Sequence, residues 1–269
     1  MTAEAALKQR YGDVVAGPAP WNAVLDRLLS HRSVRAYRTD PLPPGTLEML
    51  VAAAQSAASS SNLQLWSVVA IEDPGRKARL SAVAASQKHV VQAPLFLVWL
   101  ADLSRSQRVA DVPLDGLPYL ETFMVGIVDA ALAAQNATVA AESLGLGTVY
   151  IGALRNNPEA VAAELGLPPG VFAVFGMCVG YPDEERPASV KPRLPQSVVL
   201  HREQYAIDAV AETDGVGLYD NHLEAFQREQ AMAAVGWTKS VVSRLRNAGS
   251  LMGRDRMRAA LGALGLELR

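Results

Sequence analysis

The stretch TFMVGIVDAALAAQNATVAAESLGLG, residues 122 to 147, is the longest apolar helical segment, and the rest of the chain must pack against it. Its periodicity predicts the longest helix of the protein, over roughly 122 to 145, ended by the glycines Gly145 and Gly147. This helix is apolar on several faces, which is more apolar surface than the sheet of one subunit can cover. We therefore expect a homodimer, in which a second copy covers the remaining apolar surface.

Short apolar, β-branched and aromatic runs on either side of this helix predict buried strands. They are WSVVAIED (66–73), APLFLVWLAD (93–102), GTVYIGAL (147–154) and VFAVFGMCVGYP (171–182). Segments with helical periodicity alternate with the strands and cover 21–33, 46–59, 74–85 and 157–170. The last of these has a proline in its first turn and a glycine after its end, as helices commonly do. The pattern predicts an α+β fold in which helices cover a sheet.

The composition narrows the setting of the protein. The chain has 269 residues and a formal charge of −2, which gives no global basic field for a nucleic acid or an anionic membrane. A single cysteine, Cys178, excludes an intrachain disulfide framework and a cysteine-cluster metal site, and fits a reducing compartment. The first 20 residues contain no signal-peptide core, and no run of ~18 uninterrupted apolar residues occurs. We expect a soluble, cytoplasmic protein that binds neither nucleic acid nor membrane.

The character of the chain changes after Tyr205. Residues 206–269 have helical patterning and many charges but little strand signal. They predict a helical extension that wraps a core or a partner subunit and does not fold independently. The expected organisation is an N-terminal extension over 1–21, a core over 22–205 and the helical extension over 206–269.

Four segments that flank the predicted elements carry residues suited to chemistry. They are HRSVR (31–35), SSSNLQ (59–64), GTVYIGALRNN (147–157) and KPRLP (191–195). In the last segment, Lys191 and Arg193 alternate in an extended chain, which puts both side chains on one face, where they suit a phosphate. Each segment alone also fits an ordinary surface turn, helix end or flexible loop. The glycines match neither a Rossmann fingerprint nor a P-loop, which disfavours nucleotide folds of those kinds.

The combination of these segments, in this order, resembles the flavin-dependent nitroreductase superfamily. The resemblance is carried by HRSVR, SSSNLQ, SQKHVVQAP, VDAALAAQNATVAAESLGLGTVYIGALRNNPEAVAAELGLP, and KPRLP with HREQY. It covers roughly residues 22–205, continues weakly to the end of the chain, and points to the branch of NADPH-linked, oxygen-insensitive nitroreductases and flavin reductases. It implies a central, mostly antiparallel sheet flanked by helices, in an interlocked homodimer with a helical C-terminal extension. It also implies one FMN per subunit at the interface.

The same resemblance implies a ping-pong activity. Electron pairs would pass from NADPH or NADH to FMN, and from FMN to a small acceptor such as a nitroaromatic, a quinone or another flavin. Two other functions stay open. A flavin reductase would use the same site and release reduced FMN to a monooxygenase, and a non-redox member of the superfamily would bind or degrade flavin.

The resemblance assigns a set of basic and hydroxyl side chains to the phosphate end of FMN. His31 and Ser33, together with Lys191 and Arg193, correspond to the phosphate-binding group, and Arg32 belongs to the same segment. These basic side chains would then bind the FMN phosphate and stabilise the negative charge of the reduced flavin ring.

A second set of residues is assigned to the ring and the ribityl chain. Arg35 corresponds to the residue near the pyrimidine edge, where a cation stabilises charge on the reduced ring and raises its reduction potential. Gln87 corresponds to a residue whose amide bonds the same edge. The other assigned residues are Ser59, Ser60 and Ser61, expected from the other subunit, and Tyr150, Ile151, Gly152 and Ala153. The backbone N–H groups of the last two would lie near N5 and O4 of the ring.

Such a reaction needs neither a metal nor a general acid, because a hydride moves directly between stacked rings. His89 and His201 are the candidate proton donors, but a lone histidine is more often structural. The chain departs from the family pattern at Ala153, where a second glycine is common. It departs again in FQREQAMAAVGW (226–237), which has only Arg228 where relatives that prefer NADPH cluster several arginines.

The second departure bears on the choice of nicotinamide. Arginines elsewhere could rebuild the 2′-phosphate site, and the candidates are Arg155, Arg244, Arg246, Arg254, Arg256 and Arg258. Solvated faces of amphipathic helices account for such arginines equally well. We expect a smaller preference for NADPH over NADH than is usual in this branch.

Overall fold

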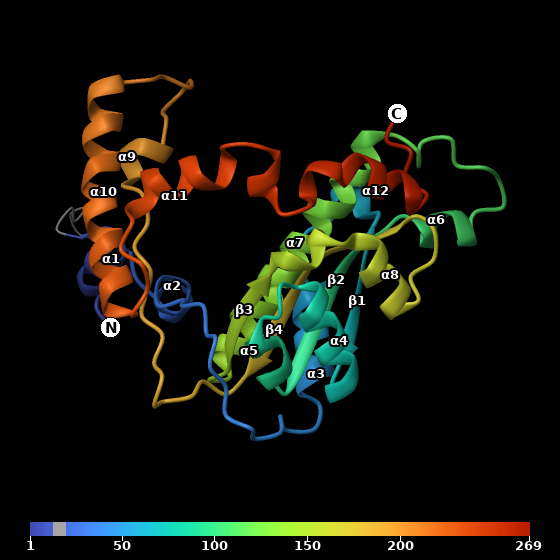
Figure 1. Ribbon diagram of the computed structural model, residues 1–269, viewed down its shortest axis with the longest axis horizontal. Helices are drawn as coiled ribbons and strands as arrows, with labels where there is room; N and C mark the ends of the chain where they lie inside the picture. The colour runs from blue at the N-terminus through green and yellow to red at the C-terminus, as the bar shows by residue number, and fades with distance from the viewer. Residues whose placement is uncertain (13–19) are drawn as a thin grey trace. The chain divides into compact units, whose positions relative to one another are not determined.

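One antiparallel sheet of four strands, in the order β1-β2-β4-β3, forms the centre of the fold (Figure 1). The computed structural model of the chain describes residues 1–12 and 20–269. The strands are β1 (Trp66–Ile71), β2 (Leu95–Asp102), β3 (Gly147–Ile151) and β4 (Val171–Gly180). All eight residues of β2 are buried, as expected for a central strand covered on both faces. The strands lie within the four predicted runs, so this part of the prediction is confirmed.

The chain divides into two compact units. The sheet unit consists of Val34–Pro187 and Met252–Arg269, and the helical unit of Met1–Ser33 and Ala188–Leu251. The α-helices of the sheet unit are α3 (Thr46–Gln55), α4 (Pro74–Val83), α5 (Lys88–Gln92), α6 (Ser104–Val109), α7 (Leu120–Ser143), α8 (Pro158–Leu165) and α12 (Met257–Ala263). Those of the helical unit are α1 (Ala3–Tyr11), α2 (Ala23–Leu29), α9 (Gln196–Val199), α10 (Ala209–Glu229) and α11 (Gly236–Leu245).

Short 3-10 turns complete the element list. They are η1 (Ser60–Asn62), η2 (Gly152–Asn156), η3 (Ala248–Leu251) and η4 (Arg254–Arg256). The α+β class, with an antiparallel sheet flanked by helices and a helical C-terminal region, is confirmed. The division into 1–21, 22–205 and 206–269 stays a prediction, and residues 13–19 of the expected N-terminal extension lie outside the described residues.

Helix α7 is the long helix predicted from the opening stretch, and it begins two residues earlier than expected, at Leu120. It packs against all four strands (Figure 1). The side chains on its sheet-facing side are alanines that are completely buried, Ala130, Ala133, Ala134, Ala137 and Ala141. Alanines at this spacing allow the helix backbone to approach the sheet closely.

Helix α7 also meets the length and composition of a membrane span, with a mean hydropathy of 1.4 over its most apolar window. In this structure 44% of that window is buried inside the protein. Core helices of water-soluble proteins pass the same test, so α7 is weak evidence for a membrane.

The loop between α3 and β1 is held by a buried carboxylate on α7. Asp129 is 1% exposed and accepts hydrogen bonds from the Ser59 hydroxyl (2.8 Å), the Ser60 N–H (3.3 Å) and the Leu65 N–H (3.0 Å). Within this loop Ser61 and Gln64 have φ near +50°, a conformation that costs energy in residues other than glycine. The three hydrogen bonds to one carboxylate hold the backbone in that conformation.

We expect Asp129→Asn to destabilise the sheet unit by about 1 to 3 kcal/mol. The amide NH2 of asparagine would replace one carboxylate oxygen and would then face a hydrogen-bond donor of the loop, which needs an acceptor. The measurement is the free energy of unfolding of the flavin-free protein in urea. Glu121→Gln is the matched control, because it is the same change at an exposed position of the same helix. Equal stabilities of the two variants would show that the carboxylate does not hold the loop.

Candidate functional site

The residues assigned to the phosphate end lie in the helical unit, on two chain segments that a single arginine joins. His31 and Ser33 follow the carboxyl end of α2, and Lys191 and Arg193 lie on the extended segment before α9. The Arg10 guanidinium donates hydrogen bonds to the His31 carbonyl (3.1 Å) and to the Lys191 carbonyl (2.7 Å). The backbones of the two basic segments are therefore neighbours, although 160 residues separate His31 from Lys191 in the sequence.

The side chains of the second segment are placed by local contacts. The Lys191 ammonium group lies over the ring of Phe226, 5.6 Å from its centroid, a cation–π arrangement. Arg193 is exposed, and its Nη1 donates to the carbonyls of Lys191 (3.3 Å) and Pro192 (3.2 Å). The Tyr219 hydroxyl donates to the Pro192 carbonyl at 3.3 Å. These contacts leave the Arg193 guanidinium at the surface, where it can receive an anion.

The residues assigned to the ring end belong to the sheet unit. The Val34 N–H donates to the Thr148 carbonyl at 2.9 Å, and Tyr37 forms a β-bridge with Pro182, so residues 34–37 run beside β3 and β4. Arg35 projects from this segment and is exposed, as is Arg32 in the helical unit. Gln87 is half-buried directly before α5, and its carbonyl accepts a hydrogen bond from the Ser81 hydroxyl (3.0 Å).

His89 on α5 lies within electrostatic range of Arg35. Burial, and next the charge of Arg35, hold the pKa of His89 below its usual value. Its Nε2 atom is buried without a hydrogen-bond partner among the described residues. The imidazole is therefore neutral at neutral pH and cannot serve there as an imidazolium acid. His201, the other candidate proton donor, stacks on exposed Tyr205 with ring centroids 4.3 Å apart.

The segment YIGAL occupies the end of β3 and the start of η2. The Tyr150 hydroxyl shares a hydrogen bond with the Thr138 hydroxyl (3.0 Å), and burial raises the pKa of Tyr150. A Cβ atom on Gly152 would come within 3.2 Å of the Arg155 guanidinium, so a side chain there would crowd this arginine. Ala153 is buried and has no positive φ, so its backbone does not require the glycine that is common in the family.

The serine segment has one engaged hydroxyl and two exposed residues. The Ser59 hydroxyl donates to Asp129 and accepts from the Gln64 N–H at 2.8 Å, so it holds the loop. Ser60 and Ser61 are exposed. An assignment of all three serines to the ribityl chain stays a prediction, and these contacts favour Ser60 and Ser61 over Ser59.

Most of the arginines considered as substitutes for the missing arginine cluster bond to the protein itself. Their acceptors are the Val174 carbonyl for Arg155, the Ser250 carbonyl for Arg244, the Asn156 side chain for Arg254 and the Glu159 carboxylate for Arg256. Arg228 forms an exposed ion pair with Glu224, four residues earlier on α10, at 2.9 Å. The smaller preference for NADPH over NADH stays a prediction.

Other chemistry finds little support in the described residues. Cys178 is buried in β4, and burial raises the pKa of its thiol, so it is a protonated, inaccessible group at neutral pH. Within residues 1–12 and 20–269, no group of three or more His, Cys, Asp or Glu side chains is arranged to hold a metal ion.

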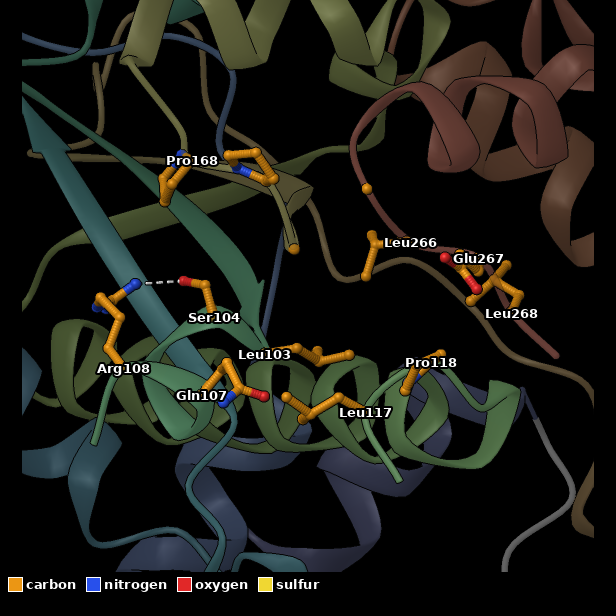
Figure 2. A pocket seen from close by; sticks show the side chains of 13 residues that line it. Leu103, Ser104, Gln107, Arg108, Leu117, Pro118, Pro168, Leu266, Glu267 and Leu268 are labelled. Atoms are coloured by element: carbon orange, nitrogen blue, oxygen red, sulfur yellow. Dashed lines mark hydrogen bonds between the residues drawn. The ribbon is translucent and has the colours of Figure 1, made fainter. Parts of the chain in front are cut away.

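An apolar cavity of about 380 Å³ lies elsewhere in the sheet unit (Figure 2). Figure 2 shows Leu103 and Leu117 facing Leu266 and Leu268 of the C-terminal segment, with Arg108 bonded to Ser104 at one side. The full lining is Leu103, Ser104, Gln107, Arg108, Leu117, Pro118, Pro168, Pro169, Gly170, Gly265, Leu266, Glu267 and Leu268. None of the residues assigned to FMN lines it.

Two residues that organise the assigned segments were not singled out from the sequence. Asp129 carried a usable signal, because it is the one acidic residue between Glu121 and Glu142 in an otherwise apolar helix. Arg10 carried none, because arginine near the end of a short surface helix is ordinary.

Both parts of the chain match models of one protein family. Residues 28–181 match the model of the nitroreductase family, and residues 191–269 match that of the nitroreductase family, C-terminal domain. The chain is 37% identical over 228 residues to the FMN reductase [NAD(P)H] of Bacillus subtilis, and this alignment covers 82% of this chain and 90% of that protein. It is 42% identical over 181 residues to the oxygen-insensitive NADPH nitroreductase of Salmonella typhimurium, and this alignment covers 67% of this chain and 74% of that protein.

Solved structures extend the likeness to almost the whole chain. The NADPH:FMN oxidoreductase from Vibrio harveyi complexed with NAD+ superimposes with a TM-score of 0.81 at 34% identity, over 92% of this chain and 100% of that one. The hypothetical oxidoreductase YcnD from Bacillus subtilis gives a TM-score of 0.86 at 34% identity, over 93% and 100%. With both halves of the chain matched and the relatives covered over most of their length, the chain belongs to the nitroreductase family.

Proposed function

We propose that this protein is an FMN-dependent NAD(P)H oxidoreductase that reduces nitroaromatics, quinones or related small acceptors. The observation that carries the proposal is the pair of basic segments, 31–33 and 191–193, whose backbones meet at the Arg10 guanidinium. A phosphate monoester suits such a set, because cations and a hydroxyl give it charge-assisted hydrogen bonds. The relatives named as FMN reductases and NADPH nitroreductases support the same reading.

Each assigned residue has a role that its own chemistry explains. His31, Ser33, Lys191 and Arg193 would hold the phosphate, with Arg32 at the edge of the same segment. Arg35 and Gln87 would hold the pyrimidine edge of the ring, and the backbone N–H groups of Gly152 and Ala153 its other polar edge. FMN, when bound, supplies the relay of an electron pair between nicotinamide and acceptor.

The chain contributes charge and position to the reaction. The Arg35 cation favours negative charge on the flavin ring, as electrostatic stabilisation does at other sites where charge develops. His89 is neutral beside it and leaves that charge undiminished. No acidic side chain is assigned to the ring, so N5 of the flavin would exchange its proton with water.

A test of the function follows the visible absorbance of the flavin in the FMN-loaded protein under argon. We expect NADPH or NADH to bleach it in a stopped-flow instrument, and a nitroaromatic to restore it, because the two half-reactions share one site. Free FMN with the same nicotinamide is the control and should bleach far more slowly. Bound FMN that is never bleached would support a non-redox FMN-binding or flavin-degrading module instead.

A flavin reductase is the second candidate, and the relatives named FMN reductase favour it. The same apparatus separates it from a nitro or quinone reductase. If free FMN added in excess is reduced catalytically and the reduced flavin passes through a dialysis membrane, the protein supplies reduced FMN. If the electrons leave only through a nitroaromatic or a quinone, it does not.

The two ends of the proposed site make separable contributions. We expect Arg193→Ala to weaken FMN binding by about 1.5 to 3 kcal/mol, the range of a charge-assisted hydrogen bond, with turnover little changed at saturating flavin. Arg35→Ala should slow flavin reduction and lower the potential of the bound flavin, with a smaller loss of affinity. Equilibrium fluorescence titration and stopped-flow reduction measure the two effects. Loss of affinity alone in both variants would contradict the division into phosphate and ring residues.

The proposal includes a cytoplasmic homodimer. Helix α7 carries a stripe of apolar residues on the side away from the sheet, all between 42% and 52% exposed and spaced by four, namely Leu120, Met124, Val128 and Leu132. An unpartnered apolar stripe of this kind on a soluble protein is typical of a subunit interface. The single buried cysteine fits a reducing cytoplasm.

We expect the protein to be a dimer by light scattering at micromolar concentration and Val128→Glu to shift it toward a monomer. A carboxylate in the middle of the stripe would lose its solvation in the interface. Val109→Glu is the control, because Val109 is 77% exposed on α6, away from the stripe. A wild-type monomer would refute the dimer, and a dimer unchanged by Val128→Glu would place the interface elsewhere.

A further inference from the structure

Helix α1 contributes a buried arginine to the helical unit. Arg10 is 5% exposed, although its residue type is normally solvated. It lies outside residues 28–181 and 191–269, the segments that the family models match. A buried guanidinium costs desolvation energy, and its position is stable only where acceptors surround it. The acceptors around Arg10 therefore show what the residue is for.

Arg10 donates hydrogen bonds to both basic segments. Nη2 donates to the carbonyls of Leu29 (2.7 Å) and His31 (3.1 Å), and Nη1 donates to the carbonyl of Lys191 (2.7 Å). The backbone carbonyl of Arg10 in turn accepts from the Arg193 N–H at 2.9 Å. One residue thus fixes the backbone on which His31 stands to the backbone on which Lys191 and Arg193 stand.

The geometry suits arginine alone among the cationic side chains. The guanidinium is a rigid plane with five N–H donors, so it can bond two chain segments at once at fixed angles. A lysine at this position would offer a single ammonium nitrogen and could not span both segments in the same way.

Charge adds a second reason for a cation at this place. The carbonyl groups at the carboxyl end of α2 carry partial negative charge, which opposes a phosphate bound at the residues that follow. Leu29 ends that helix and His31 lies two residues beyond it. The Arg10 guanidinium donates to both carbonyls, so part of this negative character is directed at Arg10 and not at the phosphate.

We propose that Arg10 is a positioning residue for the FMN phosphate, which acts by holding the two basic segments together and by hydrogen-bonding the carbonyls at the end of α2. The proposal rests on the proposed function, because it takes the phosphate of FMN as the anion. It makes α1 a working part of the cofactor site. Arg10 does not itself contact the ligand in this proposal.

The test compares the affinities of FMN and riboflavin, which differ by the phosphate alone, by fluorescence quenching of the flavin-free protein. Wild type should bind FMN far more tightly than riboflavin. Arg10→Ala should lose about tenfold in FMN affinity, the effect expected from one lost charge-assisted contact, with less than about a twofold loss for riboflavin. Arg10→Lys should lie between the two. The readout is the ratio of the two affinities, which general loosening of the fold does not change.

Asp208→Ala is the matched control for loss of stability in the same unit. The Asp208 carboxylate caps α10 by accepting hydrogen bonds from the N–H groups of Val210 (3.1 Å) and Ala211 (3.0 Å). It precedes by 11 residues Tyr219, the residue of α10 that bonds the segment of Lys191 and Arg193. This substitution should lower the free energy of unfolding and leave the affinity ratio unchanged. If Arg10→Ala is insoluble, Arg10→Lys and Arg10→Gln carry the same comparison.

The outcomes separate this inference from the function on which it rests. A wild-type protein that prefers FMN, with an unchanged ratio in the Arg10 variants, would overturn the role of Arg10 and leave the phosphate site standing. A wild-type protein that binds riboflavin as tightly as FMN would refute the phosphate site itself, and the role of Arg10 with it. An equal loss of ratio in Asp208→Ala would show that unit stability, and not positioning, sets the preference.

Discussion

The packing of α7 against the sheet is the contact on which the rest of the structure depends. Its sheet-facing side is lined with alanines, so the helix backbone lies close to the strands and the larger apolar side chains are left for other surfaces. On one flank of the same helix, Asp129 bonds the loop that carries the serines. On the side away from the sheet lies the exposed stripe that includes Val128. One helix therefore covers the sheet, holds the serine loop and exposes an apolar stripe that suits the proposed dimer.

Local use of charge explains how a slightly acidic chain can recognise an anion. The net charge of −2 gives no long-range attraction, so recognition depends on a few cations held in position. Many arginines are engaged in the structure itself, as Arg256 is with Glu159 and Arg79 is with Glu164. The backbone at His31 and at 191–193 is itself held in place, by Arg10 and by contacts such as that of Tyr219 with Pro192.

The sequence predicted the elements well where the signal was local. Helix α8 begins at Pro158 and is followed by Gly166 in the left-handed conformation, as its proline and glycine indicated. The strands lie within the predicted runs, because apolar, β-branched segments bounded by turn residues have few alternatives. The family resemblance also supplied the assigned site residues, which single segments could not have identified.

What could not be predicted depends on contacts between residues far apart in the chain. The positive φ of Ser61 and Gln64 has no local cause in SSSNLQ, because a carboxylate about seventy residues away holds the loop. The engagement of the Ser59 hydroxyl follows from the same contact. Arg10 bonds a residue 181 positions away, and nothing in the composition of α1 distinguishes it from a surface arginine. Local propensity carries no information on such contacts.

The electrostatics of the sheet unit point to charge stabilisation and not to acid–base chemistry. Burial raises the pKa values of Tyr37 and Tyr150 above the usual 10.0 and that of Cys178 above 9.0, and it lowers that of His89 below 6.5. Each shift favours the neutral form, so none of these four groups changes charge between about pH 7 and pH 9. Arginine side chains, by contrast, act in proteins as fixed cations and not as proton donors. In the proposed function, Arg35 would therefore act on the flavin ring through its charge and not through proton transfer.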